Sequence, residues 1–287
     1  MQGANIDPIL YEEGHIQKVL AELELTFPKY FEKFFMKEAR KKFQGEIESY
    51  LKEQAAYEEY MDLETLKEFE FDPNAFKGET RSQCPIVRRC LGSQEEYMKS
   101  YKRSFNSTTG RTLLDTVTRI AQFGQQYVNT FDHTTHEAAT SVEDLQLSTL
   151  NEGEYFAFGV IGYGVQSSLL YGLYPYAFAH RSQNAMWALY FMTNHKDFGC
   201  QDASEFLQVK VDTCEQNYFY PADLFGFYSL KLFLLLKEAC VAKGLVLLSE
   251  YRYIYLSAFS SFVGEIHTDD KDALKRSSTD VESQPWF

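Results

Sequence analysis

One stretch of the chain places acidic side chains and a lysine at a spacing typical of metal-dependent nucleases. It reads NHKDFGCQDASEFLQVKVD, residues 194–212, and a polar loop with two aspartates leads into an alternating segment. Nucleases of the PD-(D/E)xK type hold Mg²⁺ with two carboxylates and use a lysine to position the attacking water. Asp197 or Asp202 would supply the first acid, and Lys210 the lysine. Gln208 occupies the position of the second acid.

A glutamine at this position weakens the nuclease interpretation, because the metal would lose one of its two anionic ligands. The distance along the chain from Asp202 is also short for a hairpin that brings the two ligands together. A lysine between two valines is common in ordinary edge strands. We therefore predict an ordinary strand here and keep the nuclease as the alternative function.

A second candidate is DHTTHE, Asp132–Glu137, in which two histidines three residues apart lie between carboxylates. Imidazole and carboxylate groups are ligands for divalent metals. No third spaced ligand follows, and the polar surroundings predict a solvated loop. The other histidines stand alone in the sequence: His15, His180, His195 and His267. We expect neither a metal site nor a cofactor.

The glycine-rich segment GVIGYGVQSS, residues 159–168, follows a strand-like run and precedes a helix-like one. Dinucleotide-binding loops use glycines in such a turn to bring the backbone close to a pyrophosphate. The third glycine is misplaced, and no acid follows at the distance needed to bind the ribose. Helix packing is the preferred interpretation, and a small-ligand sensor using the Gly159–Gly164 turn remains a further alternative.

The cysteines and the hydrophobic segments predict a cytoplasmic protein. Five cysteines without a C-x-x-C spacing favour a reducing compartment over a disulfide framework or a zinc ribbon. The N-terminus lacks the basic and apolar regions of a signal peptide. Residues 155–179 carry no charge, but four glycines, a proline and polar residues predict a buried core segment rather than a membrane span.

The net charge of −13 and the pI near 5.0 bear on the choice of partner. Proteins bind DNA largely through Lys and Arg contacts to phosphates, so an acidic chain is not expected to bind nucleic acid directly. An acidic surface instead attracts basic proteins. Aromatic residues make up 16% of the chain, and they build both cores and protein interfaces.

The hydrophobic periodicity predicts an α+β protein with a helical acidic N-terminal region followed by a mixed α/β body. Residues 1–78 predict helices that begin at Asp7-Pro8 and again at Phe27-Pro28, with a break near Gly45. Residues 71–85 predict a linker with a domain boundary near residue 80, and residues 79–265 predict the body. In the body, residues 154–164 and 204–212 predict strands, and residues 221–244 predict a long helix ended by Gly244. Residues 266–287 predict a flexible tail.

Two groups of residues are candidates for contact with a protein partner. Phe105 and Asn106 lie in a basic and polar segment, SYKRSFNSTTGR, where an exposed aromatic side chain would anchor a partner. Glu53, Glu58 and Glu59 lie on the acidic N-terminal helices, whose carboxylates can mimic the phosphates of a duplex. A merely solvated acidic face is the alternative.

No motif in the chain is specific enough to predict an enzyme, and acidity with abundant aromatic residues favours a protein-binding function. The segment YGLYPYAFAHRSQNAMWALYF lies in a body, residues 150–260, that resembles the phage-encoded inhibitors of the bacterial Gabija defence system. The resemblance implies a non-enzymatic homo-oligomer, encoded by a phage or mobile element, that occludes a nuclease complex in the host cytoplasm. It implies no functional residue.

Overall fold

The computed structural model describes residues 7–37, 39–95, 98–200, 204–210 and 213–279, and within them the chain is nearly all helical. The strands in this part form one two-stranded antiparallel hairpin, β1–β2, in which Leu207 pairs with Gln216 and Lys210 with Thr213. The prediction of a mixed α/β body is therefore wrong. Of the two segments predicted as strands, residues 204–212 contribute β1, whereas residues 154–164 form compact turns.

The elements follow one another along the chain as thirteen α-helices, six short 3-10 helices and two strands within the described residues. The α-helices are α1 (Glu13–Met36), α2 (Ala39–Tyr60), α3 (Leu63–Glu68), α4 (Pro73–Ser82), α5 (Pro85–Gly92), α6 (Met98–Ser107), α7 (Gly110–Asn129), α8 (His133–Glu137), α9 (Tyr163–Leu173), α10 (Gln183–Met192), α11 (Ala222–Ala242), α12 (Arg252–Ile266) and α13 (Thr268–Thr279). The others are η1 (Pro8–Tyr11), η2 (Phe69–Phe71), η3 (Glu143–Leu145), η4 (Ser148–Asn151), η5 (Gly153–Tyr155), η6 (Ser249–Tyr251), β1 (Leu207–Lys210) and β2 (Thr213–Gln216).

Proline marks helix starts in this chain more often than it marks loops. Asp72 caps α4 with Pro73 in its first turn, and α5 likewise begins at Pro85. Proline costs nothing at this position, because the first amide groups of a helix have no partner within it. The predicted linker over residues 71–85 is therefore wrong, since α4 and the start of α5 occupy most of it.

Pro28, predicted to start a second helix, lies inside α1. An internal proline removes one backbone hydrogen bond and strains the turn before it. The helix continues because buried side chains on both sides of Pro28, such as Leu23 and Phe31, face the same core. Gly45 likewise lies inside α2 and does not break it.

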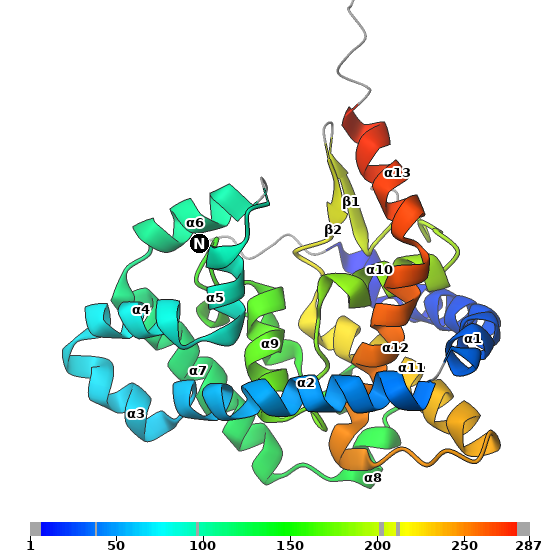
Figure 1. The fold of residues 1–287 in the computed structure, drawn as a ribbon, viewed down its shortest axis with the longest axis horizontal. Helices are drawn as coiled ribbons and strands as arrows, with labels where there is room; N and C mark the ends of the chain where they lie inside the picture. Colours follow the sequence, from blue (N-terminus) through cyan, green and yellow to red (C-terminus); the bar gives the residue numbers. More distant parts are fainter. Residues whose placement is uncertain (1–6, 38, 96–97, 201–203, 211–212, 280–287) are drawn as a thin grey trace, which may run out of the picture.

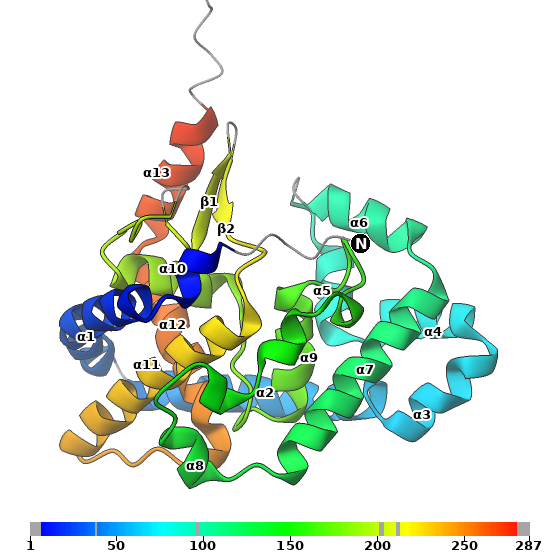
Figure 2. The ribbon, with the colours of Figure 1, turned by 180° about the vertical axis from the view of Figure 1, so that it is seen from behind.

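α2 runs across the whole molecule and joins its two halves (Figure 1). Its first half packs on α12, where the rings of Phe43 and Tyr255 are 5.0 Å apart. Its second half packs on α9, where the Tyr50 hydroxyl donates to the Gly172 carbonyl at 3.1 Å. Helices α3–α7 lie toward the C-terminal end of α2, and α1, α11 and α12 lie toward its N-terminal end, as the reverse view also shows (Figure 2).

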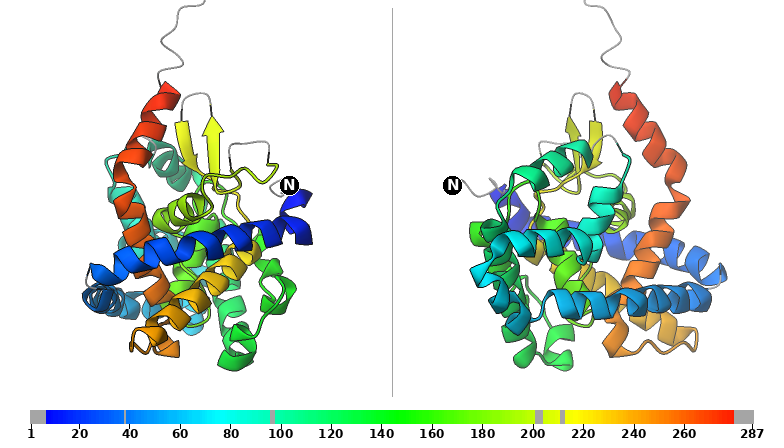
Figure 3. Two further views of the ribbon diagram at one scale, coloured as in Figure 1. Left: turned by 90° about the vertical axis from the view of Figure 1, so that its right-hand side faces the viewer. Right: turned by 60° about the vertical axis from the view of Figure 1, so that its left-hand side comes forward.

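The core is one continuous cluster of buried apolar side chains that spans the predicted boundary near residue 80. α1 contacts α10 and α11, and α2 contacts α9 and α12, so the N-terminal helices belong to the same core as the body (Figure 3). α10 and α12 are apolar on all sides and almost completely buried, as expected for central helices. None of the described helices is long and apolar enough to span a membrane.

Four further predictions have clear outcomes. The strand over 204–212 is confirmed in part by β1, which covers Leu207–Lys210, and the helix over 221–244 is confirmed by α11. The strand over 154–164 is wrong, because Gly159 at φ 78° turns the chain back so that only an isolated bridge forms between Ala157 and Ile161. In the predicted flexible tail, residues 268–279 form α13, which contacts α12 and β2.

Candidate functional site

Phe105 and Asn106 lie on α6 and contact α4, with Phe105 buried and Asn106 exposed. The Phe105 ring is 0% exposed, with the Lys77 ammonium 5.5 Å and the Arg81 guanidinium 5.4 Å from its centre. Lys77 also donates to the Asn106 carbonyl at 2.8 Å, and Arg81 donates to the Asn106 side chain at 3.0 Å. The prediction of an exposed aromatic anchor at Phe105 is corrected, because its segment forms α6 and α4 covers the ring.

The predicted acidic contacts lie on the last turns of α2. Glu53 is paired with Arg89, and Glu58 accepts a hydrogen bond from Gln54. Glu59 is exposed, and its carboxylate has no hydrogen bond or ion pair with another described residue. Of the three, Glu59 is therefore the carboxylate most available to a partner.

An exposed acidic segment begins at these glutamates and continues through α3 and η2. Residues 58–72 contain seven acidic residues and one lysine. Their exposed members and one aromatic residue define what we name the acidic–aromatic surface: Glu58, Glu59, Asp62, Glu64, Glu68, Glu70, Phe71 and Asp72. It occupies one end of the molecule, around α3 in Figure 1.

Phe71 is the most exposed large apolar side chain among the described residues, at 96%. Nearby side chains fix the backbone that presents it: Leu66 is buried, and the ring of Phe69 packs 5.5 Å from that of Phe76. Asp72 then caps α4 directly after Phe71. The segment is therefore anchored on both sides of a ring that faces solvent.

The acidic side chains of this surface divide into capping and unpartnered groups. Asp62 accepts from the Thr65 amide at 2.8 Å and from its hydroxyl at 2.9 Å, and these bonds lower the pKa of Asp62. The carboxylates of Glu59, Glu64, Glu68 and Glu70 have no partner among the residues that the structure describes. Their charge is therefore directed at solvent.

The residues predicted for a nuclease site do not form one in the described part of the chain. Asp197 is exposed and accepts from the Gly199 amide of its own loop at 3.1 Å. Asp202 lies outside the described residues, as does the side chain of Lys210 on β1. Gln208 is half-buried and pairs with Glu215 across the hairpin.

The same stretch nevertheless contributes to a group of metal-ligand type that sequence reasoning missed. His15 on α1, Cys200 and Glu205 bring one ligand atom each within 4.8 Å of one another. The His15 Nε2 contacts the Glu205 carboxylate, and both side chains are buried. The sequence predicts that His15 stands alone. In the structure Glu205, 190 residues further along the chain, contacts it.

The DHTTHE segment forms α8 and belongs to a buried charge network. Glu137 accepts from Arg252 at 2.8 Å and from Lys237 at 2.6 Å. Burial alone would raise the pKa of Glu137, but these hydrogen bonds hold it below its ordinary value. Arg252 also donates to His133 Nδ1 at 3.3 Å, and His136 Nε2 lies 2.8 Å from the Tyr253 hydroxyl. The prediction of a solvated loop is therefore wrong.

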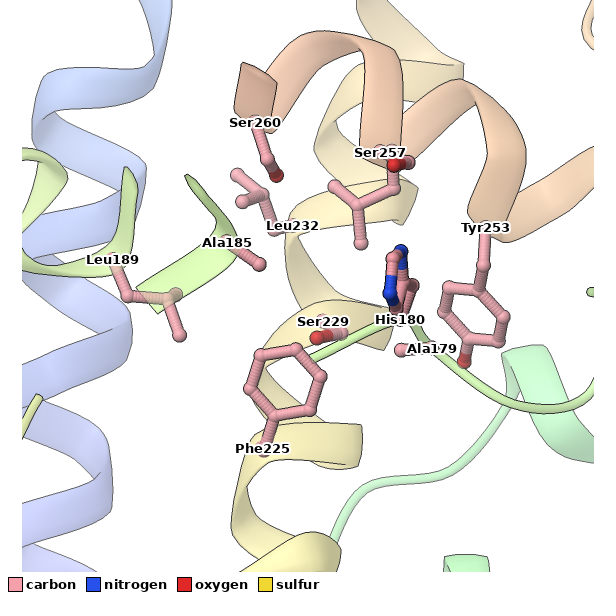
Figure 4. Close-up of a pocket in the computed structure, with 11 residues that line it drawn as sticks. Ala179, His180, Ala185, Leu189, Phe225, Ser229, Leu232, Tyr253, Ser257 and Ser260 are labelled. Atoms are coloured by element: carbon pink, nitrogen blue, oxygen red, sulfur yellow. The ribbon is translucent and has the colours of Figure 1, made fainter. Parts of the chain in front are cut away.

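A small cavity lies between α10, α11 and α12, where His180, Ser229 and Tyr253 point toward its interior (Figure 4). The cavity is large enough for about one water molecule. Burial lowers the pKa of His180 to about 4, and His180 Nε2 lies 3.1 Å from the Ser168 hydroxyl. A neutral histidine bonded inside the core is a packing feature.

The space beside Gly159 in the Gly159–Gly164 turn is filled by Ser104 of α6. A Cβ atom at Gly159 would lie 2.6 Å from the Ser104 hydroxyl oxygen, so α6 fills the space beside the glycine. Gly159 serves a turn and close packing against α6, as preferred from the sequence, whereas a Cβ atom at Gly162 would meet nothing within 4 Å.

Comparisons with known proteins leave the function to be argued from these features. No protein-family model, curated protein or solved structure matches the chain.

Proposed function

We propose that the protein acts by binding a basic protein surface through its acidic–aromatic surface. The observation that supports this most directly is Phe71, a fully presented aromatic ring surrounded by carboxylates. Large exposed apolar groups rimmed by polar ones are typical of contact sites. Phe71 thus takes the anchoring role that the sequence assigned to Phe105.

Charge and aromatic contact have different tasks in such an interface. Unpartnered carboxylates at Glu59, Glu64 and Glu68 add a local negative field that accelerates encounter with a basic partner. An aromatic side chain that enters a pocket on the partner slows dissociation, because it loses a large exposed area to the interface. The arrangement requires no catalytic residue.

The partner class that fits this surface is a protein with a basic cleft, such as the DNA-binding cleft of a nuclease. Carboxylates spaced along a surface can occupy the positions of phosphates in such a cleft. The resemblance to Gabija inhibitors implies the same target class. The proposed function is therefore inhibition of a nuclease complex by occlusion of its DNA-binding surface.

Self-association is part of this proposal, because the resemblance implies a homo-oligomer. The uncharged residues 155–179 are largely buried in the core and do not supply an open apolar face. The expectation of an oligomer now depends on the resemblance. Light scattering should give a mass of at least twice 33.3 kDa, and a monomer at micromolar concentration would contradict it.

The proposal is tested with a purified Gabija nuclease complex and a DNA substrate. We expect the protein to bind the complex, to inhibit DNA cleavage, and to compete with DNA for binding. The protein alone should leave plasmid DNA intact in Mg²⁺ or Mn²⁺. Absence of binding would remove this target. Cleavage by the protein alone that is lost in Lys210→Ala would favour the nuclease alternative.

A further inference from the structure

The cluster of His15, Cys200 and Glu205 has features that an isolated ion pair does not explain. His15 lies in the first turn of α1, Cys200 follows the turn at Asp197, and Glu205 directly precedes β1. Their nitrogen, sulfur and oxygen atoms lie within 4.8 Å of one another. Segments from opposite ends of the chain therefore place three different ligand types at one point.

The carboxylate of this cluster is held by its surroundings. Glu205 is 2% exposed, and its Oε1 accepts from the Tyr220 hydroxyl at 2.9 Å. Burial raises the pKa of the nearby Tyr228, and the charge of Glu205 raises it further. Hydrogen bonds of this kind orient metal ligands, because they fix the carboxylate without using all of its lone pairs.

The histidine of the cluster has one ring nitrogen without a partner. His15 is 3% exposed, and its Nδ1 makes no hydrogen bond in the described part of the molecule. Phe198 packs edge-on against the ring at 5.8 Å and limits its orientation. Buried polar atoms are nearly always paired, so the contact with Glu205 alone does not satisfy both nitrogens of this imidazole.

We propose that His15, Cys200 and Glu205 bind one divalent transition-metal ion, with zinc as the expected metal. Zinc accepts imidazole, thiolate and carboxylate ligands in a single tetrahedral site. A hard ion such as Mg²⁺ prefers oxygen ligands alone, so the thiol and the imidazole select against it. Three protein ligands leave the fourth position for water or an external ligand.

The alternative is a purely structural role, in which a buried histidine–glutamate pair joins α1 to the segment before β1. Such a pair accounts for the contact between His15 Nε2 and Glu205. It does not account for the thiol at the same point. Cys200 is half-buried beside an exposed loop, so an ion has a route from solvent.

Zinc titration of the purified chain, followed by dialysis and elemental analysis, tests the proposal. We expect about one tightly held ion per chain, and Co²⁺ in its place should show a thiolate-to-metal charge-transfer band. Cys200→Ser should abolish the band and weaken zinc binding at least tenfold. Cys90→Ser is the matched control, since Cys90 is also half-buried but lies on α5.

The outcomes separate cleanly even if one variant folds poorly. Wild-type protein that retains no zinc at micromolar concentration overturns the proposal. So does a charge-transfer band that survives in both Cys200→Ser and His15→Gln, or one that Cys90→Ser removes equally. None of the three ligands belongs to the acidic–aromatic surface, so this result is independent of partner binding.

Discussion

Two neighbouring segments carry opposite charge and use it in different ways. Residues 58–72 hold seven acidic residues and one basic, whereas residues 77–111 hold eight basic and three acidic. The basic side chains largely serve the fold: Lys77 donates to the Asn106 and Thr108 carbonyls, and Lys102 donates to the Ser93 carbonyl.

The acidic side chains, by contrast, mostly have no internal partner. Glu59, Glu64, Glu68 and Glu70 face solvent without a described partner, beside the exposed ring of Phe71. Charge that already satisfies helix ends is not available to another protein, whereas unpartnered charge is. Local charge composition alone therefore does not identify a binding surface. Whether each charged side chain already has a partner within the protein decides whether it is available to another protein.

The largest expected effect separates the two phenylalanines of these segments. Phe105→Ala should lower the free energy of unfolding by about 3–5 kcal/mol, because its ring is completely buried. Phe71→Ala should leave stability within about 0.5 kcal/mol, because its ring is exposed. Urea unfolding measures both, and equal destabilisation would contradict the assignment of the two rings.

Acid should weaken the interior through buried histidines. Burial lowers the pKa of His136 to about 3 and that of His180 to about 4. The unfolded chain takes up a proton near pH 6.5, so this stability is complete above that pH and is lost as the pH falls toward the folded values. Between pH 7.5 and 5, each histidine should cost about 2 kcal/mol of unfolding free energy.

Urea unfolding of His136→Gln at both pH values checks the histidine assignment. The variant should lose about 2 kcal/mol less than the wild type between them. An unchanged difference would show that His136 takes up its proton equally in the folded and unfolded states.

Reversal of the unpartnered carboxylates should slow association with a basic partner. Glu64→Lys, Glu68→Lys and Glu70→Lys together are expected to lower the association rate about tenfold at low salt, with a smaller difference at high salt. Glu12→Lys, Glu13→Lys and Glu24→Lys change the net charge equally at exposed positions on and beside α1. If both triple variants slow association equally, net charge rather than the acidic–aromatic surface is responsible.

The smallest expected effect concerns the basic segment. Lys77→Met should remove two hydrogen bonds to backbone carbonyls and lower stability by about 1 kcal/mol. Its effect on the association rate should be negligible. A large change in binding with unchanged stability would mean that the basic segment also contacts the partner.

The sequence predicted elements well where local pattern and tertiary packing agree. α11 matches an apolar run with a clear end at Gly244, and β1 matches part of a short alternating segment. Residues 154–164 have strand-like composition, but no neighbouring strand among the described residues pairs with them. Composition favours a strand, yet a strand needs a partner that only the tertiary structure supplies.

The sites were less predictable, because burial and long-range contact decide them. Phe105 and Phe71 both lie among polar residues, and only the packing of α4 on α6 shows which ring is buried. Cys200 and Glu205 lie within residues 194–212, where the sequence pattern indicated the aspartates as ligands instead. The contribution of His15 depends on the path of α1 and has no signal in the local sequence.

The most direct test of the proposed function is the dissociation rate of the complex with a Gabija nuclease after Phe71→Ala. Phe219→Ala is the matched control, since Phe219 is 54% exposed on the segment before α11. We predict that Phe71→Ala raises the dissociation rate about thirtyfold, equivalent to about 2 kcal/mol, whereas Phe219→Ala leaves it unchanged. Unchanged dissociation in Phe71→Ala, with the complex still formed, would contradict the assignment of the acidic–aromatic surface as the binding site.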